Sequence, residues 1–243
     1  MAQLQLRPNW LGKIDYVSGV RAVEIERQEI AAQEALDLKI ASHTIFGMEH
    51  PLTITLGKRA DPLQDICVSV KILKERDVRI VAVDRGGQAT LHNPGQLVIY
   101  PHLHLPTWGV GVRNFVNCLQ LATHNFLNDF GVVSYTQPGE PGLYTERGKI
   151  AFFGLRIKNG WSSHGLAINV YNRVEDFKLI RPCGQKDQKI CSLADWLDVR
   201  ENPPELPQLF EKWCTHFEQI LRYQNESLVN TSNLTGATAP LML

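Results

Sequence analysis

The chain has 243 residues, of which 44% are hydrophobic and 21% are charged, a composition that excludes a wholly disordered protein and suits one large α/β domain. Because 25 Lys and Arg balance 25 Asp and Glu, no global charge would attract nucleic acid or an anionic membrane surface. Five cysteines without a Cys-x-x-Cys pair indicate neither a disulfide framework nor a zinc knuckle. The sequence offers no secretory signal and no membrane-spanning run, so we expect a cytoplasmic protein.

The first third of the chain predicts a long helix followed by short strands. Ser18 is a candidate N-cap for a helix over residues 18–41, whose apolar positions form a broken stripe. Strands are expected at 44–46, 52–56 and 78–83.

A polar, glycine-rich segment follows, from Arg85 to Gln96 (RGGQATLHNPGQ). It stands between two strand-like runs, so a rigid sheet would hold it. Since glycine has no Cβ, another molecule can approach the backbone closely there. We interpret the segment as a ligand-binding loop; an ordinary glycine-rich turn is the alternative.

The pattern then predicts an amphipathic helix over 113–130, with Gly131 as its C-terminal stop. A strand from 132–135, a turn at 136–141 and a short return strand should follow. Residues 209–221 predict a C-terminal amphipathic helix. We expect one domain over residues 1–223 and a disordered polar tail over 224–243.

A hairpin is predicted around Asn159-Gly160, because both central positions of a type I′ turn need φ > 0. A loop centred there pairs Lys158 with Trp161, and Gly154 then falls opposite Gly165. The hairpin would carry a slot free of side chains, in which a chain-like ligand could lie. Lys149 begins the same hairpin.

Cys183 stands in Arg181-Pro182-Cys183-Gly184, a context that fits neither a regular helix nor a central strand. Loop cysteines near a positive charge are often reactive, and Arg181 would favour the thiolate. We expect the four other cysteines to be buried hydrophobes. His102 and His104 alternate on one expected strand, but no further ligand stands at metal-binding spacing, so we expect no metal site.

Four motifs in order, RGGQATLHNPGQL, GKIAFFGLRI, SSHGLAINV and RPCG followed by KICSL, resemble the signatures of the octanoyl-[acyl-carrier-protein]:protein octanoyltransferases, also called lipoyl(octanoyl) transferases. The resemblance runs from about Tyr16 to about Tyr223. It implies an α/β fold of the α+β type, similar to the catalytic domains of biotin and lipoate ligases, with a mixed, largely antiparallel sheet flanked by helices.

By position, the resemblance implies that Cys183 is the acyl-thioester nucleophile and that Lys149 favours its thiolate form. It implies a set of substrate-binding residues, which are Arg85, Gly86, Gly87, Gln88, Ala89, Thr90, Leu91, His92, Phe152, Phe153, Gly154, Gly165, Leu166 and Ala167. His164 is a further candidate for the pocket, in either a binding or a structural role.

The implied reaction moves an octanoyl group from octanoyl-acyl carrier protein to a lysine ε-amine on lipoyl domains of 2-oxoacid dehydrogenases and on the glycine cleavage H protein. It is the first step of protein lipoylation. Lys149 could accept the proton of the acceptor amine. We expect no cofactor, neither ATP nor metal, because an amide replaces a thioester.

Two alternatives stay open at this point. The first is an ATP-dependent lipoate or biotin ligase on the same fold, which needs no nucleophilic cysteine. The second is a non-catalytic protein that binds acyl carriers or lipoyl domains. Three positions depart from the family pattern: Asn93 replaces a usual glycine, and Gln185 and Cys191 replace an aliphatic residue and a threonine. Asn tolerates the left-handed region, so we expect Asn93 to preserve a turn.

Overall fold

The computed structural model describes residues 4–35, 42–182, 188–197 and 203–235. Its main feature is a seven-stranded mixed sheet in the order β1-β2-β6-β10-β9-β8-β7, in which only β1 and β2 are parallel. The strands are β1 Gln5–Lys13, β2 Ser42–Glu49, β6 Gln96–His102, β7 Tyr135–Gln137, β8 Glu140–Thr145, β9 Gly148–Lys158 and β10 Trp161–Asn169. The expected mixed, largely antiparallel sheet is confirmed.

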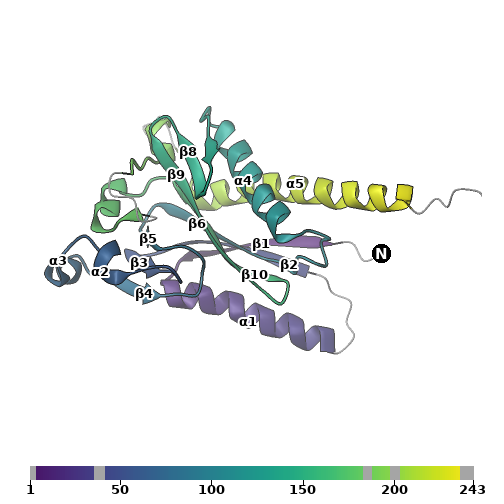
Figure 1. Ribbon diagram of the computed structural model, residues 1–243, viewed down its shortest axis with the longest axis horizontal. Helices are drawn as coiled ribbons and strands as arrows, with labels where there is room; N and C mark the ends of the chain where they lie inside the picture. The colour runs from purple at the N-terminus through teal and green to yellow at the C-terminus, as the bar shows by residue number, and fades with distance from the viewer. Residues whose placement is uncertain (1–3, 36–41, 183–187, 198–202, 236–243) are drawn as a thin grey trace, which may run out of the picture.

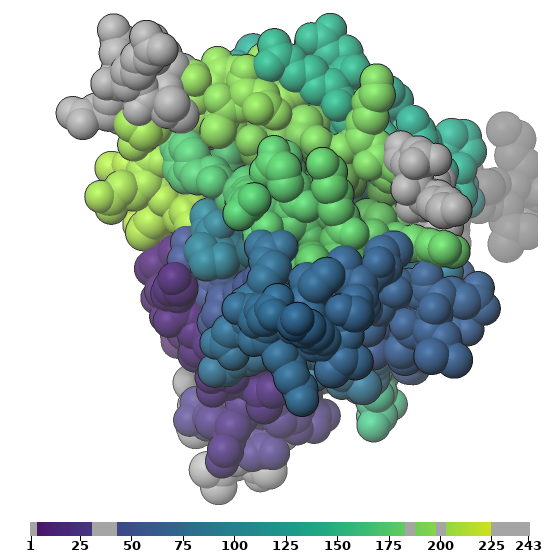
Figure 2. All heavy atoms as spheres, turned by 90° about the vertical axis from the view of Figure 1, so that its left-hand side faces the viewer, coloured from purple at the N-terminus to yellow at the C-terminus, as the bar shows by residue number. Residues whose placement is uncertain are grey.

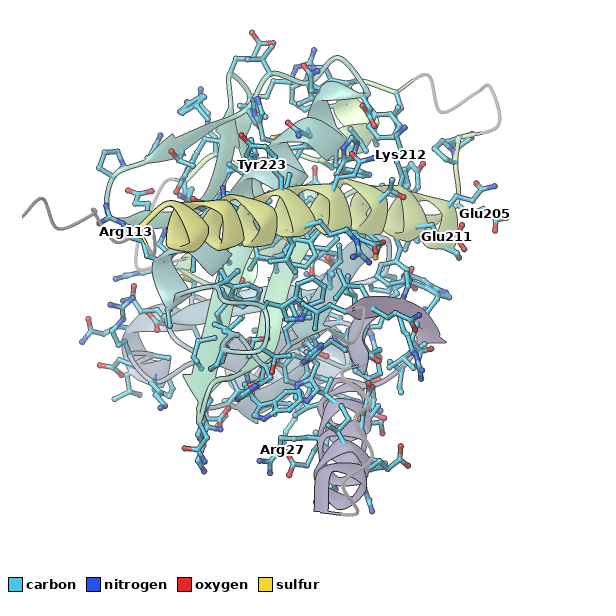
Figure 3. The ribbon with its side chains drawn as sticks, turned by 90° about the vertical axis from the view of Figure 1, so that its right-hand side faces the viewer. Arg27, Arg113, Glu205, Glu211, Lys212 and Tyr223 are labelled. Atoms are coloured by element: carbon cyan, nitrogen blue, oxygen red, sulfur yellow. The ribbon has the colours of Figure 1, made fainter. Side chains whose placement is uncertain are left out.

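Long helices cover both faces of this sheet (Figure 1). α4 (Val112–Asn128) and α5 (Leu206–Thr235) pack together on one face, over a core that includes Phe115, Trp213 and Phe217. α1 (Tyr16–Ala35) lies on the other face, over Phe46, Val98 and Tyr100, among others. Figure 3 looks onto α5, with Arg27 of α1 lying below it.

A second, three-stranded sheet of order β4-β3-β5 forms one end of the molecule. Its strands are β3 Thr53–Leu56, β4 Arg79–Ala82 and β5 Ala89–His92, joined to the short helices α2 (Pro62–Asp65) and α3 (Val70–Glu75). A separate apolar cluster attaches this sheet to the 3-10 helix η1 (Val174–Leu179). Figure 2 shows these segments side by side, the small sheet in blue and the η1 segment in green. The last short element is η3 (Leu193–Asp195).

The helices differ from the sequence expectation at their ends. α1 begins at Tyr16, and the Asp15 carboxylate accepts a hydrogen bond from the backbone N–H of Ser18 at 3.1 Å. Ser18 is therefore inside the helix, and the prediction that it caps the helix was wrong. The helix was expected to run to residue 41, but residues 36–41 lie outside the described residues. The helix expected over 113–130 is α4. Gly131 follows its C-terminal end with φ +71°, as expected for a glycine that stops a helix.

α5 extends through Thr235, so it includes residues that we expected to be disordered from 224 onward. No glycine or proline stands between Tyr223 and Gly236 to interrupt helical hydrogen bonding, and the polar composition alone did not end the helix. Residues 236–243 lie outside the described part of the chain. None of the described helices is both long and apolar enough to cross a bilayer.

Two strands were missed from the sequence. β1 contains Pro8 and Gly12 and lies at the sheet edge, where proline costs no hydrogen bond to a neighbour on its outer side. β5 lies inside the segment interpreted as one loop, because residues 89–92 pair with β3. The loop before β5 therefore covers only residues 83–88.

Candidate active site

A pocket of about 130 Å³ lies where the two sheets and the start of α1 meet. Its apolar wall comes from β9 and β10, and its opposite wall from the glycine-rich segment before and within β5. The lining residues are Tyr16, Arg59, Arg85, Gly86, Gly87, Gln88, Ala89, Thr90, His92, Tyr100, Gly139, Glu140, Pro141, Phe152, Phe153, Gly154, His164, Gly165, Leu166 and Ala167. Three segments far apart in sequence, quoted above for their motifs, thus share one pocket.

The hairpin that forms the apolar wall has the predicted register. Asn159 and Gly160 both have positive φ, Lys158 pairs with Trp161, and Gly154 pairs with Gly165. This register is confirmed. It follows from the Asn-Gly turn, because a slip of one residue would turn every side chain to the other face.

The expected slot free of side chains is only partly present. The space beside Gly154 holds the side chain of Arg85, whose Cδ would lie 2.9 Å from an added Cβ. Gly165 instead faces the neighbouring strand, where an added Cβ would collide with the carbonyl oxygen of Ile99. His164, with φ +56°, makes the strand irregular just before Gly165. Both glycines line the pocket, but each leaves room for a different neighbour: Gly154 for the side chain of Arg85, and Gly165 for the backbone of Ile99 in β6.

Arg85 is a buried scaffold of the loop. Its Nη2 donates to the carbonyl oxygen and to the hydroxyl of Thr55 at 2.9 and 2.8 Å, and its Nη1 donates to the carbonyl oxygen of Gly86. These bonds tie the glycine-rich loop to β3. Gly57 has no room for a Cβ, because the carbonyl oxygen of Gly87 would lie 2.5 Å away.

Lys149 is fully buried, with its ammonium group 5.0 Å from the ring centre of Tyr144 and 5.1 Å from that of Phe152. Lys149 and Phe152 are three residues apart, so a regular strand would place them on opposite faces. The β8–β9 pairing changes register between Lys149 and Ala151, and this bulge turns Lys149 toward the face of Phe152. The ammonium group therefore lies beside a wall of the pocket. Lysine is almost never fully buried unless it is paired.

Cys183 lies outside the described residues, as does Gln185. The chain that follows them is described from Gln188, whose side chain donates to the hydroxyl of Tyr144 at 3.1 Å. Lys149 exchanges backbone hydrogen bonds with this stretch: its N–H donates to Lys189, and its carbonyl oxygen accepts from Cys191. Residues 189–191 thus run directly beside Lys149.

A cluster of five buried aromatic rings lies at the pocket, and all but His50 line it. Neighbouring ring centres lie 5.0 to 6.3 Å apart. The cluster consists of Tyr16, His50, His92, Tyr100 and His164. Burial lowers the pKa of His50 and of His164 to about 4, and lowers that of His92 well below its ordinary value. It raises the pKa of both tyrosines. The whole cluster is therefore uncharged at neutral pH.

His164 has a partner at each ring nitrogen. The Nε2 lies 2.9 Å from Oδ1 of Asp84, and the Nδ1 lies 3.3 Å from the hydroxyl of Tyr16. Because a carboxylate only accepts hydrogen bonds, neutral His164 donates from Nε2 and accepts at Nδ1. His92 contacts Oε1 of Gln96 through Nδ1 at 2.8 Å. Both histidines are thus fixed in place.

One predicted binding residue does not line the pocket. Leu91 is fully buried in the apolar cluster that contains Ile54 and Phe177. It alternates with Thr90 and His92 along β5, so its side chain belongs to the opposite face of that strand. Conversely, Tyr16, Arg59, Tyr100 and Glu140 line the pocket and were not selected from the sequence; no motif signals them, since they come from separate elements.

Asn93 does not occupy a left-handed turn, because its φ is not positive. The prediction that it preserves such a turn was wrong. Its buried side chain donates to the carbonyl oxygen of Arg173 and to the carboxylate of Asp176, and accepts from Asn172. Cys191 is buried beside Thr145, and burial raises the pKa of its thiol to about 11. Asn93 thus connects its own segment to residues 172–176, and Cys191 connects its segment to the end of β8.

The family model of the lipoyl protein ligase A/B catalytic domain matches residues 23–218. The chain belongs to this family. It is similar to a protein named octanoyltransferase from Cellvibrio japonicus, 36% identical over 177 residues, covering 73% of this chain and 78% of the relative. The octanoyltransferase of Shewanella loihica is 36% identical over 218 residues, covering 88% and 90%. The resemblance stated from the motifs is confirmed.

Solved structures of other proteins share the fold at low identity. The putative lipoate protein ligase Ta0514 of T. acidophilum, with bound lipoic acid, has a TM-score of 0.63 at 13% identity, covering 90% of this chain and 87% of that one. The biotin protein ligase of Aquifex aeolicus has a TM-score of 0.53 at 14% identity, covering 90% and 72%. The expected similarity to lipoate and biotin ligase catalytic domains is confirmed.

Proposed function

We propose that this chain transfers an octanoyl group from an acyl carrier protein to a lysine amine on a lipoyl domain, through an acyl thioester on Cys183. The observation that carries the proposal is the buried Lys149 beside an apolar pocket, on the hairpin whose motif matches the octanoyltransferases. Relatives of that name are 32 to 41% identical to this chain. The chain is thus an acyltransferase, and its donor, acceptor and intermediate are the parts to test.

In the first half-reaction the Cys183 thiolate attacks the thioester carbonyl of the acyl carrier. A new C–S bond forms to Cys183, the C–S bond to the carrier breaks, and the carrier leaves as a thiol after taking a proton from the Lys149 ammonium group, which becomes a neutral amine. An ammonium group near the thiol favours the nucleophilic thiolate, so Lys149 would promote this step. Its support is the pairing of Lys149 with residues 189 and 191, shortly after Cys183.

In the second half-reaction the neutral ε-amine of the acceptor lysine attacks the acyl group on Cys183. An amide bond forms, the C–S bond to Cys183 breaks, and the proton lost by the amine passes to Lys149 or back to the sulfur. The exchange of a thioester for an amide needs no ATP. A lipoate protein ligase from Thermoplasma acidophilum was solved in a study of that ligase and its E2 lipoyl domain, which supports a lipoyl domain as the acceptor here.

Intact mass spectrometry after incubation with octanoyl-carrier protein tests the proposal. The wild-type chain should gain one octanoyl group without ATP, and the adduct should be released by hydroxylamine. Peptide mapping should place it on Cys183, and Cys183→Ser should abolish both adduct and transfer.

Cys67 is exposed, so the expectation that it is buried was wrong, and Cys67→Ser gives a matched control that removes an accessible thiol other than the predicted nucleophile. That variant should keep full activity. An adduct that forms only with ATP would favour the ligase alternative instead. Tight binding of the carrier without any adduct or transfer would favour a non-catalytic binding protein.

A further inference from the structure

Two cavities of the described structure share a wall. Besides the pocket, a cavity of about 560 Å³ lies between α1 and the outer half of the β9–β10 hairpin. Tyr100 and His164 line both cavities. The second cavity has a more charged lining than the pocket, and its charged or titratable members besides Tyr100 and His164 are Arg21, Glu24, Arg27, Asp84, His102, Arg156 and Lys158. Figure 3 shows Arg27 beside the ribbon of α1.

The two cavities follow one another along the same strands. On β9, Phe152 and Gly154 line the pocket, whereas Arg156 and Lys158 line the second cavity. These four positions share one face, because side chains alternate along a strand. Lys149 stands before Phe152, at the other end of the pocket. The order along the hairpin is therefore Lys149, pocket, wall and second cavity.

His164 forms the wall in a constrained backbone conformation. It pairs with Leu155, between the two sets of lining residues, and has φ +56°. The left-handed region is unfavourable for a residue with a side chain. Two hydrogen bonds, to Asp84 and Tyr16, hold the imidazole, and its side chain is only 5% exposed. The fold thus fixes a bulky ring at the point where the pocket would otherwise continue.

We propose that His164 sets the acyl chain length by closing the pocket at the end farthest from Lys149. The inference rests on the proposed function, which puts the thioester at the Lys149 end. The acyl tail then runs along Phe152, Phe153 and Leu166 toward the wall. A chain too long for the pocket would need the space of the imidazole. Without that ring, the tail would continue into the second cavity.

His164→Gly tests the proposal, because glycine removes the ring and adopts a positive φ at no steric cost. Transfer rates should be compared for octanoyl, dodecanoyl and hexadecanoyl carriers. Wild type should favour octanoyl. In the variant, the ratio of dodecanoyl to octanoyl transfer should rise by at least about tenfold, since pocket contacts discriminate a few methylenes by that much. Asparagine also tolerates the left-handed region but keeps a side chain, so His164→Asn should give a smaller rise in this ratio.

Asp77→Gly is the matched control, because Asp77 also has a positive φ, of 49°, but is exposed and lines neither cavity. Its chain-length preference should equal that of wild type. Val20 lines the second cavity, so adding Val20→Trp to His164→Gly should abolish the gain for long chains. An unchanged preference in both folded His164 variants overturns the proposal, as does a gain that Val20→Trp leaves intact. A wild-type chain that transfers no octanoyl group overturns the proposed function instead.

Discussion

Gly154 lies directly opposite Gly165 across the β9–β10 hairpin, yet the two glycines adjoin different parts of the molecule. The neighbour of Gly154 is the side chain of Arg85, whereas the neighbour of Gly165 is the backbone of β6. A side chain can move aside, but a central strand cannot. The two positions therefore separate a role in the pocket from a role in strand packing.

We predict that Gly165→Ala lowers the free energy of unfolding by about 1–3 kcal/mol, the usual cost of forcing extra atoms into a packed site. Gly154→Ala should cost less than Gly165→Ala, because one side chain yields more readily than a central strand even when hydrogen bonds to Thr55 and Gly86 hold its guanidinium, but it should slow octanoyl transfer by displacing the pocket side chain of Arg85. Urea unfolding and transfer assays on both variants check this. Equal losses of stability would contradict the asymmetry.

Lys149 is the second position to test, since its ammonium group is buried against two aromatic rings. Lys149→Met keeps most of the side-chain volume and removes the charge, so it should fold and slow formation of the acyl-enzyme by about 10²–10⁴-fold, the range of a lost proton-transfer group. The rate of adduct formation on Cys183, followed by mass spectrometry, is the measurement. Rates within a factor of three of wild type would exclude a catalytic role for the amine.

The hairpin shows why part of the site could be predicted from sequence. Asn159-Gly160 fixes φ > 0 at both turn positions, so the register, and with it the pairing of Gly154 with Gly165, follows from local chemistry. The position of Lys149 does not follow, because it depends on a bulge in the β8–β9 pairing that no residue pattern signals.

The polar end of the pocket could not be predicted for a different reason. Tyr16 comes from α1, Tyr100 from β6 and His164 from β10, and only tertiary packing brings them together. β1 was missed because Pro8 and Gly12 weaken its strand pattern. Leu91 was assigned to the pocket with its motif, although the alternation along β5 turns it away. A motif shows which segment lies at the pocket, but the strand geometry decides which of its side chains face the pocket.

Asn93 gives a third prediction, through the hydrogen bonds that its buried side chain makes with Asn172, Arg173 and Asp176. Asn93→Gly introduces the residue that the motif resemblance implies for this position but leaves buried partners unsatisfied, so it should lower the free energy of unfolding by about 1–3 kcal/mol. Asn159→Gly is the control, because its φ of +51° suits glycine and its side chain is exposed; it should change stability by less than about 0.5 kcal/mol. Chemical denaturation measures both, and a neutral Asn93→Gly would show that the hydrogen bonds contribute little.

The buried histidines predict how stability depends on pH. Burial lowers the pKa of His43, His50 and His164 to about 4, against about 6.5 for an exposed histidine. Between these values the unfolded chain binds protons that the folded chain does not bind, so the free energy of unfolding rises with pH. It should therefore fall as the pH is lowered from about 6.5 to about 4, by at most about 1.4 kcal/mol per pH unit for each histidine.

Above pH 7 these three side chains are neutral in both states and contribute no pH dependence. Urea unfolding at intervals from pH 4.5 to 7.5 measures the slope. His50→Asn removes one of the titrating groups, so its slope should be shallower than that of wild type even if its absolute stability is lower, because the slope counts only the protons bound on unfolding. A wild-type stability that is flat between pH 5 and 6.5 would mean that these imidazoles take up protons in the folded state. The aromatic cluster at the pocket, which includes His50 and His164, would then be charged at acidic pH.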